Sequence, residues 1–133
     1  PFIVRAPGLS KSGTASEAMV ELIDVYPTLA DLAELKAPNH LQGISLRPLL
    51  GHPDRLGKRK YAYSVVTRGP KNLGYALRNQ NWRYGKWPDG EELYNLRTDP
   101  QEKNNLAQKD DLKERLEDFR DILAEKQNLF EKN

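Results

Sequence analysis

The chain has 133 residues, of which 30% are charged, and its mean hydropathy is -0.79. This length allows one compact domain and excludes two large ones. It has no cysteine, which excludes disulfides, thiolate metal sites and a cysteine nucleophile. No window approaches the roughly 20 apolar residues that a membrane span requires. The chain opens on Pro1 inside an apolar run, so we expect it to be a piece of a longer protein.

Charge is segregated along the chain, although the formal net charge is only +2. Residues 47–88 contain ten Lys or Arg and a single acid, Asp54, whereas residues 89–133 contain eight bases and thirteen acids. A basic stretch of this kind indicates contact with anions, which would be phosphates, sulfates or the protein's own acidic C-terminal helix. The alternative is a solvated strand face that the helix partly neutralises.

The first 51 residues predict one strand and two short helices. Pro1–Val4 has the apolar character of a buried strand, and Pro7-Gly8 ends it as a turn. Asp24 has the position of an N-cap, and leucines at helical spacing predict a helix over about 25–35. Ser45 caps a second short helix, residues 46–50, which Gly51 closes.

Residues 52–60 are a basic connector, and the pattern after them changes to that of strands. The expected strands are Tyr61–Val66, Tyr75–Asn79, Trp82–Trp87 and Glu92–Leu96, separated by turn residues that include Gly74. Strand alternation places Trp82 and Tyr84 on one face and Arg83 and Trp87 on the other. Residues 110–130 then carry an apolar stripe at helical spacing: Leu112, Leu116, Phe119, Leu123 and Phe130.

These patterns predict an α+β fold. Its main part is a small antiparallel sheet of three to four strands, covered by a long C-terminal amphipathic helix, with an N-terminal strand and short helices before it.

The chain by itself offers no catalytic constellation. His40 and His52 are the only histidines and both fall in loops, so no metal site is expected within this segment. No serine has the frame of a nucleophile elbow. The basic and aromatic residues 78–87 do not form a stacking platform on either strand face, so we expect no nucleic-acid partner.

Several short motifs in a fixed order are more specific than any one alone. They are PFIVRAPG at 1–8, VELIDVYPTLADLA at 20–33, LQGISLRPLL at 41–50, GYALR at 74–78, ELYNL at 92–96, and DP at 99–100 followed by NNL at 104–106. This series resembles the C-terminal part of type I sulfatases, in the alkaline-phosphatase-like superfamily. Residues 62–87 are most similar to the iduronate-2-sulfatase branch.

The resemblance implies a division of the chain and a missing partner. Residues 1–51 would be the end of the large α/β sulfatase domain, 52–60 the connector, and 61–133 the C-terminal subdomain. The formylglycine nucleophile and the calcium ion of the family would belong to the absent N-terminal catalytic domain, so no cofactor is expected in this segment. The family also implies a periplasmic or secreted location.

The resemblance also implies two substrate-binding residues, Arg68 and Lys71. In iduronate-type sulfatases an Arg shortly after the Ala-Tyr-Ser strand lies at the active site, and a Lys further on contacts the sugar carboxylate. Arg68 and Lys71 are the residues here that match these positions. The guanidinium of Arg bonds two oxygens of a sulfate or carboxylate at once. Their alternative roles are an ion pair for Arg68 and a solvated loop position for Lys71.

Three functions follow from these observations. The first is the C-terminal segment of a sulfatase that hydrolyses sulfate esters of a sulfated sugar and supplies substrate contacts and packing, but not the nucleophile. The second is a phosphoester hydrolase of the same superfamily. The third is a stand-alone module that binds sulfated polysaccharide through the basic stretch without catalysis.

Overall fold

The computed structural model describes the chain except residues 1, 10, 12, 68, 70–71 and 132–133, and except the side chains of residues 130 and 131. The chain divides into two compact units, Pro1–Lys60 and Tyr61–Asn133. Among the described residues, no helix combines the length and the apolar character needed to cross a bilayer.

The first unit contains a 3₁₀ turn and two short helices: η1 (Leu22–Asp24), α1 (Val25–Leu32) and α2 (Arg47–Gly51). The expected helix over 25–35 therefore ends three residues early, because Glu34 takes a positive φ of 59°. Gly51 is the last residue of α2 rather than the residue after it. The expected Ser45 cap is wrong by one position, because Leu46 is the N-cap of α2 and makes no side-chain cap bond; the Oγ of Ser45 accepts the Arg47 N–H at 3.2 Å.

The expected N-terminal strand is wrong for the described residues 2–4, which have no regular structure. Phe2 is 47% and Ile3 88% exposed. A strand is stable only when its backbone groups pair with a neighbour. None of the strand pairs in the described part of the chain involves these residues, so their apolar sequence is not sufficient for a strand.

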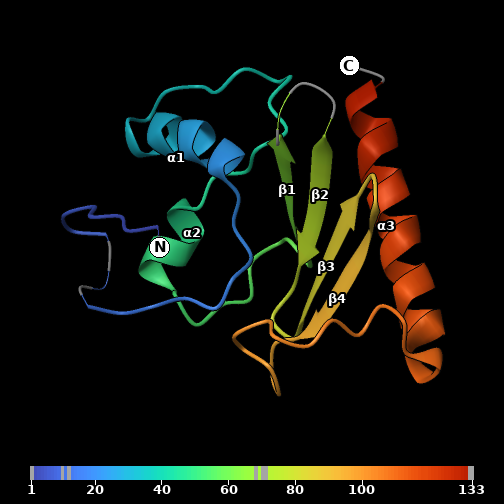
Figure 1. Ribbon diagram of the computed structural model, residues 1–133. Helices are drawn as coiled ribbons and strands as arrows, with labels where there is room; N and C mark the ends of the chain where they lie inside the picture. The colour runs from blue at the N-terminus through green and yellow to red at the C-terminus, as the bar shows by residue number, and fades with distance from the viewer. Residues whose placement is uncertain (1, 10, 12, 68, 70–71, 132–133) are drawn as a thin grey trace. The chain divides into compact units, whose positions relative to one another are not determined.

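The second unit is a four-stranded antiparallel meander with the order β1-β2-β3-β4. Its strands are β1 (Ala62–Thr67), β2 (Leu73–Arg78), β3 (Trp82–Trp87) and β4 (Gly90–Asn95). A 3₁₀ turn, η2 (Asp110–Leu112), leads into the long helix α3 (Lys113–Glu131), which lies along one face of the sheet (Figure 1). The expected α+β fold, with a small sheet and a long C-terminal helix, is confirmed.

One row of side chains across the sheet forms the core of this unit. Register places Tyr63, Leu77, Tyr84 and Leu93 opposite one another on successive strands. The last three are fully buried, and α3 covers them with Leu116, Phe119 and Leu123. The Phe119 ring stacks on that of Tyr84, with 5.7 Å between centroids. The 116, 119, 123 spacing keeps these three residues on one side of the helix.

Candidate functional site

The two expected substrate residues, Arg68 and Lys71, lie outside the described residues. They fall between β1, which ends at Thr67, and β2, which begins at Leu73. Thr67 and Leu73 are the last pair in the register of these strands. Inside the connection, Gly69 has a positive φ of 81°, which favours glycine, and the Asn72 N–H donates to its carbonyl at 3.5 Å. Both candidates therefore belong to a hairpin connection whose root is fixed.

The root of this hairpin is packed by Trp87 on the face of the sheet opposite α3. The indole ring covers Gly74, where an added Cβ would lie 2.3 Å from the ring. The same ring reaches Gly85, whose added Cβ would lie 3.8 Å from the indole nitrogen. The expectation that Gly74 separates strands is wrong, since it is the second residue of β2. Its missing side chain makes room for Trp87, which sequence spacing does not reveal.

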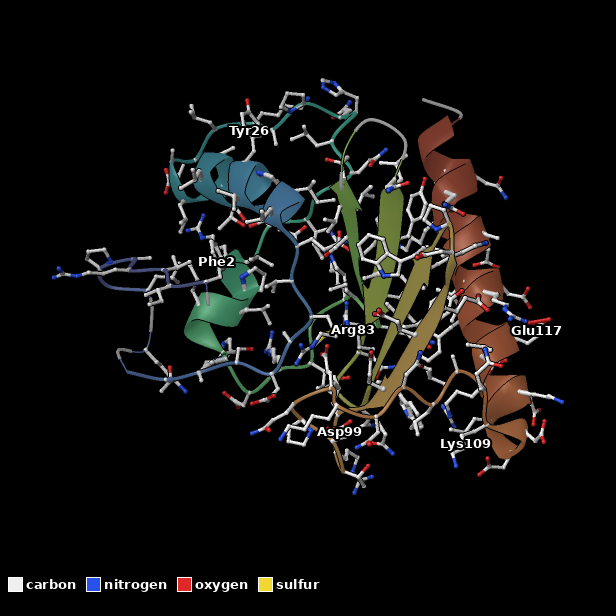
Figure 2. The ribbon with its side chains drawn as sticks, viewed as in Figure 1. Phe2, Tyr26, Arg83, Asp99, Lys109 and Glu117 are labelled. Atoms are coloured by element: carbon white, nitrogen blue, oxygen red, sulfur yellow. The ribbon has the colours of Figure 1, made fainter. Side chains whose placement is uncertain are left out.

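Arg83 lies on this same face, away from α3 (Figure 2), so the predicted alternation of β3 is confirmed. Its guanidinium pairs with Glu102 at 2.7 Å and Glu92 at 3.7 Å. It also lies over the Tyr94 ring, 5.8 Å from the centroid. Arg83 is thus paired with two acids of this chain, one in β4 and one in the segment that follows it.

A second ionic cluster, in the first unit, is built around Asp24, which is fully buried. Its carboxylate accepts the Glu21 N–H and the Ile44 N–H, each at 2.9 Å, and pairs with the Arg59 guanidinium. Arg59 also pairs with Glu21 at 3.0 Å. Burial alone would raise the pKa of Asp24, but the hydrogen bonds from Arg59 and the two backbone groups outweigh it and lower that pKa.

Asp24 is the N-cap residue of α1, as expected, but its side chain makes no cap hydrogen bond. The carboxylate does not cap α1 but joins three separate segments of the first unit. Gly43 makes this possible, because an added Cβ there would lie 2.0 Å from the Ile23 carbonyl oxygen. Thr28 completes the junction: its hydroxyl donates to the Asp24 carbonyl at 2.6 Å and accepts the Leu46 N–H at 2.9 Å. The sequence shows no signal for this, since Arg59 is 35 positions away.

Ion pairs of three arginines show how the positive charge of the basic stretch 47–88 is partly neutralised. Arg47 pairs with Asp31 at 3.1 Å, Arg59 with Glu21 and Asp24, and Arg83 with Glu92 and Glu102. Protein carboxylates therefore neutralise part of the stretch. They come from residues 21–31 and 92–102, and not from the C-terminal helix, which was one of the alternatives that the sequence left open.

The helix α3 instead contributes a cation, Arg120, that pairs with an acid of the sheet. Arg120 pairs with Glu91 and with Glu117. Glu91 also accepts the hydroxyl of the buried Tyr84. The hydrogen bonds from Arg120 are the main reason that the pKa of Glu91 falls to about 2, with Tyr84 adding to them against the opposing effect of burial. Burial and the neighbouring Glu91 raise the pKa of Tyr84 above its ordinary value.

A groove of about 670 Å³ lies beside this cluster, between α3 and residues 107–110. Four carboxylates and three cations line it: Glu91, Asp110, Glu114 and Glu117 against Lys109, Lys113 and Arg120. A sulfated ligand would meet more negative than positive charge here, so the groove does not fit an anionic substrate.

No group of three or more His, Cys, Asp or Glu residues in the described part of the chain could hold a metal ion. His40 and His52 are exposed and lie in loops, where the sequence placed them.

The sequence matches a known protein family over nearly its whole length. The model of the family "N-sulphoglucosamine sulphohydrolase, C-terminal" matches residues 1–129. The chain belongs to this family, which makes it a C-terminal sulfatase domain of the alkaline-phosphatase-like type.

Curated relatives support the same class. The chain is 35% identical over 125 residues to arylsulfatase K of Gallus gallus, a match that covers 80% of this chain and 22% of the relative. It is 29% identical to an N-acetylglucosamine-6-O-sulfatase of Bacteroides thetaiotaomicron, covering 100% of this chain and 25% of that protein. It is 32% identical to a Δ4,5-hexuronate-2-O-sulfatase of the same organism, with 80% and 24% covered. The chain thus spans about a quarter of the length of these relatives.

Solved structures show the fold in related enzymes. A protein in complex with its substrate D-glucosamine-2-N,6-O-disulfate has a TM-score of 0.88 at 28% identity, covering 98% of this chain and 28% of that one. A phosphonate monoester hydrolase of Silicibacter pomeroyi has a TM-score of 0.74 at 25% identity, covering 93% and 28%. The expected family is confirmed, whereas membership of the iduronate-2-sulfatase branch stays a prediction.

Proposed function

We propose that this chain is the C-terminal segment of a sulfatase that removes sulfate from a sulfated sugar, in the manner of an iduronate-2-sulfatase. The observation that carries the proposal is the sulfatase family match over residues 1–129. The similarity to a hexuronate-2-O-sulfatase supports a uronic acid as the sugar, and the similarity to an N-acetylglucosamine-6-O-sulfatase supports the rival, an amino sugar. The parent enzyme would act in the periplasm or outside the cell.

The nucleophile and the metal of the proposed enzyme would lie elsewhere in it. A formylglycine made from a Cys or Ser would supply the nucleophile as a hydroxyl of its hydrate, and a calcium ion would supply positive charge for the sulfate oxygens. Two of the described carboxylates are already bound to cations of this chain: Asp24 to Arg59, and Glu91 to Arg120, with the Tyr84 hydroxyl also donating to Glu91. This segment would therefore contribute binding and packing.

Arg68 and Lys71 would supply that binding. The connection 68–72 contains these two cations and no acid, so its sequence favours an anion. Arg68 would bond a sulfate or carboxylate through two N–H groups, and Lys71 would approach it as a point charge. The packing of Trp87 on Gly74 would keep the root of the hairpin in place.

The test uses the complete protein that contains this chain, assayed for sulfate release from a 2-sulfated hexuronate disaccharide and from 6-sulfated glucosamine. Arg68→Ala and Lys71→Ala should each lower kcat/KM by about 10- to 100-fold, the loss expected for one charge-assisted hydrogen bond. Arg68→Lys should recover only part, because it keeps the charge and loses the fork.

Arg97→Ala and Lys103→Ala are the matched controls, since both residues are exposed on the second unit. They should leave kcat/KM unchanged. Wild-type rates in the Arg68 and Lys71 variants on both sugars would refute their role as substrate residues. Preference for 6-sulfated glucosamine would refute the iduronate-type specificity alone.

The phosphoester alternative has one supporting observation, the similarity to a phosphonate monoester hydrolase. Release of the alcohol from a phosphonate monoester, without sulfate release from either sugar, would favour it. The polysaccharide-binding alternative is tested on the 133-residue chain by salt elution from heparin. The neutralisation of Arg47, Arg59 and Arg83 by protein carboxylates supports weak retention, and strong salt-dependent retention would favour that alternative.

A further inference from the structure

The two edges of the sheet differ in how their backbone groups are satisfied. At the β4 edge, the Leu93 N–H donates to the Asn105 side chain at 3.0 Å, and the Leu93 carbonyl accepts the Leu106 N–H at 2.8 Å. The Asn105 amide also donates to the Glu91 carbonyl at 3.0 Å. The segment after β4 therefore closes this edge, because it bonds groups that a further strand would otherwise bond.

The β1 edge, on the other side of the sheet, is open in the described part of the chain (Figure 1). β1 pairs with β2, and its backbone at residues 64–67 makes no further hydrogen bond with any described residue. Val65 and Val66, whose side chains lie on opposite faces of the sheet, are 49% and 48% exposed. Every second residue of an edge strand directs its N–H and C=O away from the neighbouring strand, so this edge offers donors and acceptors to a partner.

The sequence of β1 has none of the features with which proteins ordinarily protect an open edge. Such features are charged side chains, proline and β-bulges. The six residues AYSVVT contain no charge and no proline, and their register with β2 runs from Ala62 to Thr67 without a skipped residue. The covered edge strand, β4, carries Glu91 and Glu92 instead. A regular, uncharged edge of this kind is a template for another extended strand.

We propose that β1 pairs antiparallel with β1 of a second copy of this chain, which joins two four-stranded sheets into one continuous sheet. A twofold axis perpendicular to the sheet keeps every side chain on its own face. With the axis at Val65, that residue lies opposite its own copy, Ser64 opposite Val66, and Tyr63 opposite Thr67. Cross-strand pairs of β-branched and aromatic residues stabilise a sheet, and no like charges meet within this pair.

The chemistry of the edge favours a second copy over other occupants. β1 contains no cation that would bind a sulfated sugar or a nucleic acid. The same six residues supply both sides of the pair, so a twofold interface requires no other protein. The inference goes beyond the proposed function and does not depend on which reaction the complete protein catalyses.

The first measurement is sedimentation velocity of the 133-residue chain and of the complete protein that contains it, over a range of concentrations. Both should dimerise as concentration rises, and the short chain should reach twice its monomer mass of 15.2 kDa. Val65→Lys should weaken either dimer at least about tenfold, because two like charges would face each other across the pair. Leu56→Lys, at a position that is 77% exposed and outside the sheet, is the matched control and should leave both dimers unchanged.

Charge exchange tests the pairing itself. Val65→Glu should weaken the dimer as Val65→Lys does, and an equimolar mixture of the two variants should restore it, since opposite charges then meet. Because Val65 is already half-exposed, both variants should keep the wild-type far-UV circular dichroism, which separates loss of pairing from failure to fold. A dimer that neither variant weakens, or a mixture that does not restore it, would overturn the inference.

Hydrogen exchange identifies what covers the edge. The amides of residues 64–67 that face away from β2 should exchange several-fold more slowly in the dimer than in the Val65→Lys monomer. A complete protein that stays monomeric and still protects these amides would mean that another of its own segments covers the edge. A monomer with rapid exchange would mean that the edge stays open. Either result would overturn the inference, and none of these readouts uses sulfate release, so they are independent of the test of Arg68 and Lys71.

Discussion

The indole ring of Trp87 occupies the space into which a side chain at Gly74 would project. An added Cβ at Gly74 would lie 2.3 Å from the ring, closer than packed atoms approach. Gly74 pairs with Val66 in the register and lies directly beside Leu73, where β2 begins. This contact therefore ties the end of β3 to the root of the hairpin that carries the two proposed substrate residues.

Gly74→Ala should destabilise the protein by about 1–3 kcal/mol, because the methyl group forces Trp87 or the strand to move. Urea unfolding measures the change. In the double variant with Trp87→Ala the two losses should be less than additive, since the clash is gone. Gly90→Ala is the control, because an added Cβ there has nothing within 4 Å. A fully additive double variant would contradict the contact.

Gly43→Ala should loosen the first unit. Its methyl group would meet the Ile23 carbonyl at 2.0 Å, and the displaced segment would withdraw the Ile44 N–H from Asp24. Hydrogen exchange should quicken between residues 21 and 47 and stay unchanged in the strands of the second unit. Gly51→Ala is the control, since its nearest atoms lie 4.0 Å away. Wild-type exchange in Gly43→Ala would refute the close approach.

Arg59→Met should lower the free energy of unfolding by about 3–5 kcal/mol, the typical loss when one partner of a buried ion pair is removed. The reason is that Asp24, which is fully buried, keeps its negative charge without its cation. Adding Asp24→Asn should restore part of the loss. Lys58→Met changes an adjacent exposed cation and should have little effect on the urea midpoint. Equal midpoints for the Arg59 and Lys58 variants would count against the cluster.

Glu91 should make stability sensitive to acid. Its pKa is lowered from 4.5 to about 2, mainly by the hydrogen bonds from Arg120. The stabilisation that its charge provides is therefore complete above pH 4.5 and is lost as pH falls from there towards 2. Glu91→Gln should flatten this part of the pH profile, measured by urea unfolding between pH 5 and pH 2. Glu114→Gln, at an exposed position of α3, is the control, and identical profiles for all three proteins would disprove the effect.

Periodic patterns predicted most of the second unit. Alternation placed Trp82 and Tyr84 opposite Arg83 and Trp87, and the spacing of Leu116, Phe119 and Leu123 predicted the face of α3 that covers the sheet. Both patterns follow from the geometry of a single element, which repeats every two residues in a strand and every 3.6 in a helix. They needed no knowledge of distant residues.

The candidate site was less accessible to such reasoning. The family resemblance suggested Arg68 and Lys71, and both lie outside the described residues. Trp87 is visible in the sequence, but its role at the hairpin root depends on the absence of a side chain at Gly74, on another strand. Patterns within one segment do not reveal a contact between two strands. The sequence therefore predicted Gly74 to be a turn residue.

The sequence by itself determined the sulfatase family, through the order of several motifs along the chain, and the strands and amphipathic helix of the second unit, through residue spacing within each element. Only the tertiary structure decided how Asp24 and residues 2–4 behave. Asp24 has the sequence of a helix cap, yet Arg59 and Ile44 recruit its carboxylate from distant segments. Residues 2–4 have the sequence of a strand, yet strand formation requires a neighbour to accept and donate backbone hydrogen bonds.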